Sequence, residues 1–288
     1  MSEINWFPGH MTKALREMEN NIRLVDCVCE LADARIPYSS RNPALDEILA
    51  RKPRLIILNR ADQADPNLTK RWISYYQGQG FAAIETDCKS GKGVDKFSAA
   101  VRALLKERLE ALEAKGQAGR PLRAMVVGIP NVGKSSFINR VAGRKAAAAS
   151  DKPGVTRGKQ WVTVTKGLEL LDTPGVLWPK FEDRTVGDRL GFIGSVKDTV
   201  MDSETMALRL LEVLKRDYGE MLSERYKLKD TDFIGAEPWE LLEKIGRKRG
   251  MLISGGEIDT ERASVMLLDE YRGGKLGKIS FESPAEYE

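Results

Sequence analysis

Along the first 178 residues, apolar positions follow two alternating patterns, one typical of strands and one typical of helices. Strands are indicated by short apolar runs, namely VDCVCELAD, RLIILN, AAIETD, RAMVVG, QWVTVT and LELLD. The stretches between them space their apolar residues as helices do, so that Leu15, Met18 and Ile22 share one face and residues 94–114 predict one long helix. Such alternation predicts an α/β fold with a mostly parallel sheet covered by helices on both faces.

Beyond Trp178 the strand signals fade and only helical spacing remains. SETMALRLLEVLKRDYG, PWELLEKIGRKRG and DTERASVMLLDEYRGG each carry apolar residues at helical intervals and stop at glycine. The sequence therefore predicts two domains, an α/β domain over residues 1–178 and a small all-helical domain over residues 179–288.

Composition narrows the class of protein. A content of 42% hydrophobic and 31% charged residues is typical of a globular chain, and neither an export signal nor a run of 18 apolar residues is visible, so we expect a cytoplasmic protein that does not enter a membrane. Three cysteines and one histidine make a disulfide framework or a Cys/His zinc site improbable. Residues 1–180 hold 29 basic against 19 acidic side chains, whereas the remainder holds 17 against 23.

Two segments carry residues suited to binding phosphates. GIPNVGKS, residues 128–135, lies between an apolar strand and a helix, where backbone N–H groups from Asn131, Val132, Gly133, Lys134, Ser135 and Ser136 would cradle phosphate oxygens. The Lys134 ammonium would lie at the β- and γ-phosphates, and the Ser135 hydroxyl would reach Mg²⁺. In LLDTPG, Asp172 can hold Mg²⁺ through water and the Gly175 N–H can touch the γ-phosphate. The alternatives are a chance glycine-rich turn and an ordinary loop.

Two further segments can read the base. In LIILNRAD, residues 55–62, the Asp62 carboxylate can accept both the N1–H and the 2-amino group of guanine, and Asn59 can orient the neighbouring loops, with Arg60 and Ala61 between them. Adenine offers no such pair of donors, so the motif favours GTP and GDP over ATP. In TDCKSGKG the N–H groups around Cys88 and Lys89 can face the guanine carbonyl. The alternatives are an Asx turn that closes a strand and a plain loop.

These motifs are the elements of a Ras-like P-loop GTPase in permuted order, because the base-reading motifs precede the phosphate-reading ones. From WFPGHM through DARIP, NRAD, GIPNVGKSS, PGVT and DTPG to the helical tail, the chain resembles the circularly permuted GTPases of the YlqF/RbgA type, which act in assembly of the large ribosomal subunit. The resemblance implies a GTP-bound form that engages a late precursor particle, whose stimulation of GTP hydrolysis to GDP and phosphate triggers release. The permuted join would be KGQAGRP, residues 115–121.

The resemblance also implies roles for single residues. Thr156 of PGVT would be the switch threonine on Mg²⁺ and the γ-phosphate, and Asn131 would help to hold K⁺. Two positions depart from the family pattern: Arg60 replaces the usual lysine of the base motif, and Asp87-Cys88-Lys89 replaces Ser-Ala-Lys. We expect altered affinity rather than altered base specificity.

A water-positioning residue is missing after DTPG, where Ras-type enzymes have glutamine and this chain has Val176. The only histidine, His10 of NWFPGHM, is the candidate to replace it, since an imidazole can orient water or move a proton near neutral pH. The alternative is that Trp6, Phe7 and His10 only anchor the N-terminal arm and start the first helix.

Basic residues cluster in the otherwise acidic helical tail and suggest contacts to RNA phosphates. An ordinary solvated face is the competing interpretation. A nucleotide-dependent scaffold that barely hydrolyses GTP and a P-loop kinase or ATPase are the other classes of protein to be separated from the assembly factor. The candidate RNA contacts are Lys244, Arg247, Lys248, Arg249, Arg272, Lys275 and Lys278.

Overall fold

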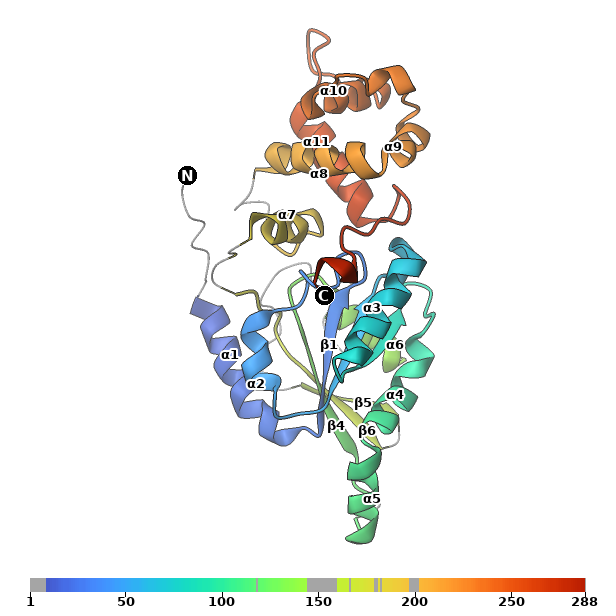
Figure 1. Ribbon diagram of the computed structural model, residues 1–288. Coiled ribbons are helices and arrows are strands. Elements are labelled where there is room, and N and C mark those ends of the chain that lie inside the picture. The colour runs from blue at the N-terminus through green and yellow to red at the C-terminus, as the bar shows by residue number, and fades with distance from the viewer. Residues whose placement is uncertain are drawn as a thin grey trace. The chain divides into compact units, whose positions relative to one another are not determined.

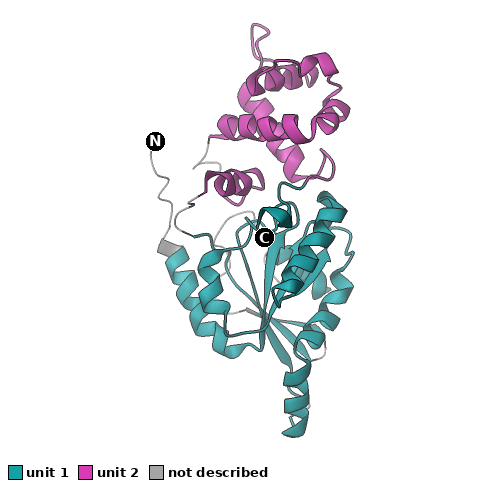
Figure 2. Ribbon diagram, in the orientation of Figure 1, with its two compact units in different colours: residues 1–182, 280–288 teal, residues 183–279 magenta. Residues whose placement is uncertain are grey.

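The structure is a computed structural model that describes residues 9–117, 119–143, 160–165, 167–178, 181, 183–196 and 202–287, without the side chains of residues 9, 10 and 160. It divides into two compact units, residues 1–182 together with 280–288, and residues 183–279 (Figure 2). The last nine residues therefore belong to the first unit, whereas the predicted division at residue 178 placed them in the helical domain. Hydrogen bonds and ring contacts from residues 280–287 to the first unit account for the difference.

A six-stranded sheet in the order β3-β2-β1-β4-β6-β5 forms the centre of the first unit (Figure 1). All neighbouring strands are parallel except β5 and β6, which are antiparallel. This confirms the predicted mostly parallel sheet. The strands are β1 (Cys27–Asp33), β2 (Arg54–Asn59), β3 (Ala82–Thr86), β4 (Leu122–Gly128), β5 (Gln160–Thr165) and β6 (Leu168–Asp172).

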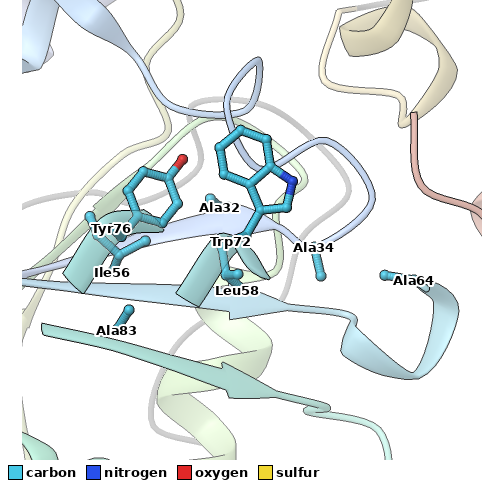
Figure 3. Packing of buried hydrophobic residues seen from close by; sticks show 8 residues of the cluster. All are labelled: Ala32, Ala34, Ile56, Leu58, Ala64, Trp72, Tyr76 and Ala83. Atoms are coloured by element: carbon cyan, nitrogen blue, oxygen red, sulfur yellow. The ribbon is translucent and has the colours of Figure 1, made fainter. Parts of the chain in front are cut away.

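Helices lie on both sides of this sheet (Figure 1). Every residue of β1 is buried, as expected of a strand covered on both faces. On one face, Trp72 and Tyr76 of α3 pack over alanine, isoleucine and leucine side chains of β1, β2 and β3 (Figure 3). The helices are α1 (Gly9–Asn21), α2 (Asp46–Leu49), α3 (Pro66–Gly78), α4 (Phe97–Leu104), α5 (Lys106–Ala114) and α6 (Lys134–Val141).

Two local predictions are wrong. The single helix expected over residues 94–114 is divided into three elements, a short 3-10 turn followed by α4 and α5. The break between α4 and α5 lies at Leu105, whose backbone leaves helical geometry at φ −105° and ψ 20°. In α1 the buried apolar residues are Met11, Ala14 and Met18. Of the predicted face only Met18 is buried, since Leu15 is half-buried and Ile22 lies in the 3-10 turn that follows the helix.

The second unit contains helices only, apart from an isolated bridge between Leu252 and Ile258, among the residues described. α8 packs against α10 and α11, and its residues Leu210, Leu211 and Leu214 are buried. Within the described parts of the chain, no helix is long and apolar enough to span a membrane. The helices are α7 (Arg184–Phe192), α8 (Ser203–Asp217), α9 (Gly219–Tyr226), α10 (Pro238–Lys248) and α11 (Thr260–Arg272).

Candidate nucleotide site

The predicted phosphate and base motifs meet at one edge of the sheet, although Asn59 and Asp172 are 113 positions apart in the sequence. Parallel strands bring their carboxyl ends to the same edge, and the strand register pairs Asp33 with Asn59, Asn59 with Thr86, and Val126 with Asp172. Loops that follow such ends are where ligands bind in open α/β sheets. The phosphate and base motifs therefore lie together at this edge, although their order in the sequence is permuted.

The loop between β4 and α6 has the backbone of a phosphate-binding loop. Asn131 lies in the left-handed region at φ 59°, and Gly133, directly before α6, has φ 100°. A Cβ on Gly133 would lie 2.4 Å from the Asn59 amide nitrogen, so only glycine fits this close approach. The helix then starts at Lys134, with its free N–H groups directed at the loop.

Lys134 is almost fully buried, and its ammonium donates to the carbonyls of Gly128, at 3.1 Å, and Ile129, at 2.8 Å. Burial lowers the pKa of Lys134 to about 8, although nearby Asp172 acts in the opposite direction. Burial likewise raises the pKa of Asp172 despite the lysine charge. Both charged groups are thus poorly solvated, which favours a ligand that brings charges of its own.

The low pKa of Lys134 predicts that affinity for GDP depends on pH. Phosphate oxygens bind the ammonium form, and they raise its pKa, so binding above pH 8 must take up a proton. Affinity is expected to be nearly constant below pH 7 and to fall roughly tenfold between pH 7 and pH 9, as one titrating group dictates. Isothermal titration calorimetry in two buffers of different ionisation enthalpy measures both the affinity and the proton uptake.

Lys134→Arg is the matched control, because a guanidinium stays charged over this range while the titration of guanine itself is unchanged. A pH profile of GDP affinity that is the same for both proteins would contradict the assignment of the titrating group to Lys134.

The oxygen donors predicted for Mg²⁺ fit that ion. Ser135, in the first turn of α6, is half-buried, and Asp172 is buried at the end of β6. A hydroxyl and a carboxylate are hard oxygen ligands, and Mg²⁺ typically takes one or two such groups together with water and phosphate oxygens. The third predicted ligand, Thr156, lies outside the described residues.

The DTPG segment packs directly on the phosphate loop. The Thr173 hydroxyl donates to the carbonyl of Val126 at 2.6 Å. A Cβ on Gly175 would lie 2.8 Å from the backbone nitrogen of Pro130, so this close contact also requires glycine. Val176 is fully buried, and its N–H donates to the carbonyl of Gly128 at 3.4 Å. The Val176 side chain therefore belongs to the core and is not directed at solvent, where water would be positioned.

Asn59 connects the base motif to the phosphate loop. Its side-chain amide donates to the carbonyl of Val132 at 3.0 Å, and its side-chain oxygen accepts from the Thr86 hydroxyl at 3.2 Å. Because Asn59 is buried, each of these bonds is shielded from water. One side chain thus connects the segments at the ends of β2, β3 and β4.

Arg60 also bridges the two motifs. Its backbone is left-handed, with φ 60°, and its guanidinium donates to the carbonyl of Asn131 at 3.0 Å and lies 3.8 Å from the Asp33 carboxylate. Asp33 is buried and forms a bidentate pair with Arg35, at 2.9 and 2.8 Å. Although burial opposes it, the charge of Arg35 holds the pKa of Asp33 below its ordinary value.

Asp33 and Arg35, both in the DARIP segment, received no role from the sequence pattern. The available signal was the position of Asp33 at the end of a buried strand, which parallel pairing places beside Asn59.

The loop after β3 corrects one prediction. The Asp87 carboxylate accepts from the N–H of Lys89 at 2.7 Å, so this N–H is not available to a guanine carbonyl. Among the described residues, the N–H of Cys88 has no recorded partner and remains the candidate. Asp62 is exposed by surface area, but neighbouring atoms partly desolvate its carboxylate, and this desolvation together with the charge of Asp87 raises its pKa. Ala61, between Arg60 and Asp62, begins a 3-10 turn.

His10 lies in the first turn of α1, since that helix starts at Gly9. The sequence analysis assigned His10 to an N-terminal arm, whereas the backbone of His10 is already helical. The side chain of His10 lies outside the described residues, so its proposed catalytic role stays a prediction.

Four of the seven predicted RNA contacts have partners within the second unit. Lys244 donates to the carbonyl of Asp232 at 3.0 Å, and Lys248 donates to the carbonyl of Lys227. Arg249 lies 3.5 Å from the Glu270 carboxylate, and Arg272 donates to the carbonyls of Phe192 and Gly191. Of the seven candidates, the remaining three, Arg247, Lys275 and Lys278, are exposed, and their side chains form no ion pair or hydrogen bond with the described residues.

Comparison with known proteins agrees with this geometry. The family model described as 50S ribosome-binding GTPase matches residues 123–232. Ribosome biogenesis GTPase A of Bacillus cereus is 48% identical over 284 residues, which cover 99% of this chain and 95% of that protein. Two structures of relatives are similar over 94% of this chain: GDP-bound TM YlqF, with 30% identity, TM-score 0.67 and 100% of that chain covered, and GNP-bound YlqF from T. maritima, with 29%, 0.65 and 98%.

Proposed function

This chain belongs to the ribosome biogenesis GTPase A family, and from that premise we propose that it is an assembly factor for the large ribosomal subunit. Its GTP-bound form binds a late precursor particle made of ribosomal RNA and proteins. The particle stimulates hydrolysis of GTP to GDP and phosphate, and hydrolysis releases the protein.

The observation that carries this proposal is the connection made by Asn59 between the base motif and the phosphate loop. A kinase or ATPase would have no use for an exposed carboxylate, Asp62, held next to that connection, because adenine has no pair of donors for it. The match of residues 123–232 to a 50S ribosome-binding GTPase model supports the choice of particle.

In the proposed reaction the residues of this chain bind the nucleotide, orient the attacking water and keep other water out of the site. Lys134 and the N–H groups around it bind the phosphates, and the Gly175 N–H meets the γ-phosphate. Ser135, Asp172 and Thr156 would hold Mg²⁺. A bound Mg²⁺ would supply positive charge to offset the charge that develops on the β- and γ-phosphate oxygens. Asn131 helps to hold K⁺, and the imidazole of His10 orients the attacking water in place of Val176.

Turnover of GTP by the full-length protein, with and without purified large-subunit precursors, tests the proposal. Turnover alone is expected to be slow, and precursors are expected to raise it by an order of magnitude or more, since activators of Ras-type GTPases supply up to about 10⁵-fold. Both turnover measurements are made in potassium salt and repeated in sodium salt, and the difference shows whether K⁺ contributes to hydrolysis. Equal turnover with and without precursors would contradict stimulation by the particle and favour a scaffold.

The three exposed cations Arg247, Lys275 and Lys278 are expected to contact RNA phosphates. Replacing all three by alanine should weaken co-sedimentation of the protein with precursors and reduce its salt dependence by roughly one unit of log–log slope for each phosphate that is no longer neutralised. Replacing Lys96, Lys106 and Lys115, exposed in the first unit, is the charge-matched control. An unchanged salt slope for the first variant would place the RNA contact elsewhere.

A further inference from the structure

A loop of the first unit is bonded to the chain on both sides of the helical unit. This loop, residues 34–42, follows β1 and will be called the β1 loop. Val176, which precedes the end of the first unit at residue 182, and the segment through which the chain returns, residues 280–287, both form hydrogen bonds to this loop. The contacts all lie within the first unit.

On the exit side the contact is made by Asn42. This residue is 2% exposed, and its side-chain amide donates to the carbonyl of Val176 at 2.9 Å. The N–H of Val176 donates to the carbonyl of Gly128 in the phosphate loop. Val176 is thus held between the phosphate loop and Asn42. Gly175, whose N–H is proposed to meet the γ-phosphate, directly precedes this fixed residue.

On the return side the contact is made by Glu282. Its carboxylate is buried and accepts from the N–H groups of Tyr38, at 2.7 Å, and Ser39, at 3.1 Å, and from the Ser39 hydroxyl. The N–H of Phe281 donates to the carbonyl of Arg35 at 2.9 Å, and the ring of Tyr287 stacks on Tyr38 with centroids 3.8 Å apart.

The return segment is also fixed to the core. The indole of Trp72, which packs over the sheet in Figure 3, donates to the carbonyl of Glu282 at 3.2 Å. The N–H of Asp65 donates to the Ser280 hydroxyl at 3.0 Å. Because this anchor is part of a packed cluster, it restrains the β1 loop more firmly than a surface contact would.

We propose that Asn42 is a positioning residue for recognition of the γ-phosphate, and that Glu282 keeps the β1 loop in the shape that places Asn42. The inference rests on the proposed role of Gly175. Its physical basis is that a peptide held from both sides needs no ordering when the ligand arrives, whereas a loose one does. GDP has no γ-phosphate, so its affinity does not depend on this peptide.

The variant that isolates the donor is Asn42→Ser. The side-chain oxygen of Asn42 also caps the turn at Ala44 by accepting its N–H at 3.0 Å, and serine can keep such a cap but is too short to reach Val176. Asp26→Ala is the matched control. The side chain of Asp26 is only 5% exposed and accepts the N–H of Arg123, but Asp26 lies at the opposite edge of the sheet, directly before β1.

The experiment measures the affinity of the full-length wild type and variants for GDP and for a non-hydrolysable GTP analogue, together with thermal unfolding. Asn42→Ser is expected to lower the affinity for the analogue roughly tenfold, which is the scale of one buried hydrogen bond. The affinity for GDP should change less than about twofold. Glu282→Ala is likewise expected to lower the affinity for the analogue more than the affinity for GDP. Asp26→Ala should lower the unfolding temperature and leave the ratio of the two affinities unchanged.

The double variant tests whether Glu282 acts through Asn42. Residues that act through one element give non-additive effects, so the combined loss of analogue affinity should be smaller than the product of the two single losses. Equal weakening of both nucleotides by Asn42→Ser, or no weakening, would overturn the positioning role, and multiplicative losses would overturn the link to Glu282. A wild type that binds neither nucleotide would instead contradict the proposed function itself.

Discussion

Gly133→Ala is expected to lower the affinity for both GDP and a GTP analogue by roughly 100-fold. The backbone of Gly133 has φ 100°, which costs an L-residue about 1–2 kcal/mol, and its new Cβ would meet the Asn59 amide nitrogen at 2.4 Å. Asn59 must then move, and its bond to the carbonyl of Val132 is lost, which costs about 1 kcal/mol more. Titration with a fluorescent GDP derivative measures the effect.

Gly143→Ala is the control for backbone strain. Gly143 also has a left-handed backbone, with φ 64°, and follows the same helix, α6, but a Cβ there meets no described atom within 4 Å. It should destabilise the protein slightly and leave nucleotide affinity within about twofold, as a distant site does. Wild-type affinity in Gly133→Ala would show that the contact with Asn59 does not shape the site.

His10→Ala is expected to leave GTP binding intact and to remove most of the turnover that precursors stimulate. Groups that move or orient a proton in the transition state typically contribute 10²- to 10⁴-fold, so we expect a loss of roughly 100-fold or more. The burial of Val176 supports this prediction, because that side chain cannot position water. Single-turnover hydrolysis with saturating precursors measures the chemical step without product release.

His10→Gln separates two roles of the imidazole. Glutamine can orient water but does not carry a proton, so partial activity would indicate orientation and none would indicate proton transfer. Phe7→Ala tests the anchoring alternative for the N-terminal arm. If anchoring were the only role, both Phe7→Ala and His10→Ala would weaken co-sedimentation with precursors, and stimulated turnover at saturation would be unchanged.

Much of the fold could be predicted because its information is local. All six strands coincide with short apolar runs, and the permuted motif order sufficed to place the fold among P-loop GTPases. The break at Leu105 could not be predicted, because the sequence around it has helical spacing and neither glycine nor proline. A pattern of propensities does not show where packing turns a helix.

Contacts between segments that are distant in the sequence could not be predicted either. The prediction of RNA contacts treated Arg249 and Arg272 as free cations, although Glu270 and the carbonyls at the end of α7 engage them. Likewise, nothing in FESPAEYE indicates that Glu282 would be buried against Ser39. Within the site, the roles of Asp33 and Arg35 follow only from strand register, which periodicity does not specify.

The bonds from Lys134 to the carbonyls of Gly128 and Ile129 have a kinetic consequence. The phosphate loop is closed by bonds within the chain, so its ordering entropy is lost during folding and not at each binding event. An incoming phosphate exchanges partners with an ammonium that is already in position. The loop therefore has no need to refold between the departure of one nucleotide and the arrival of the next, and each cycle can start from the same shape.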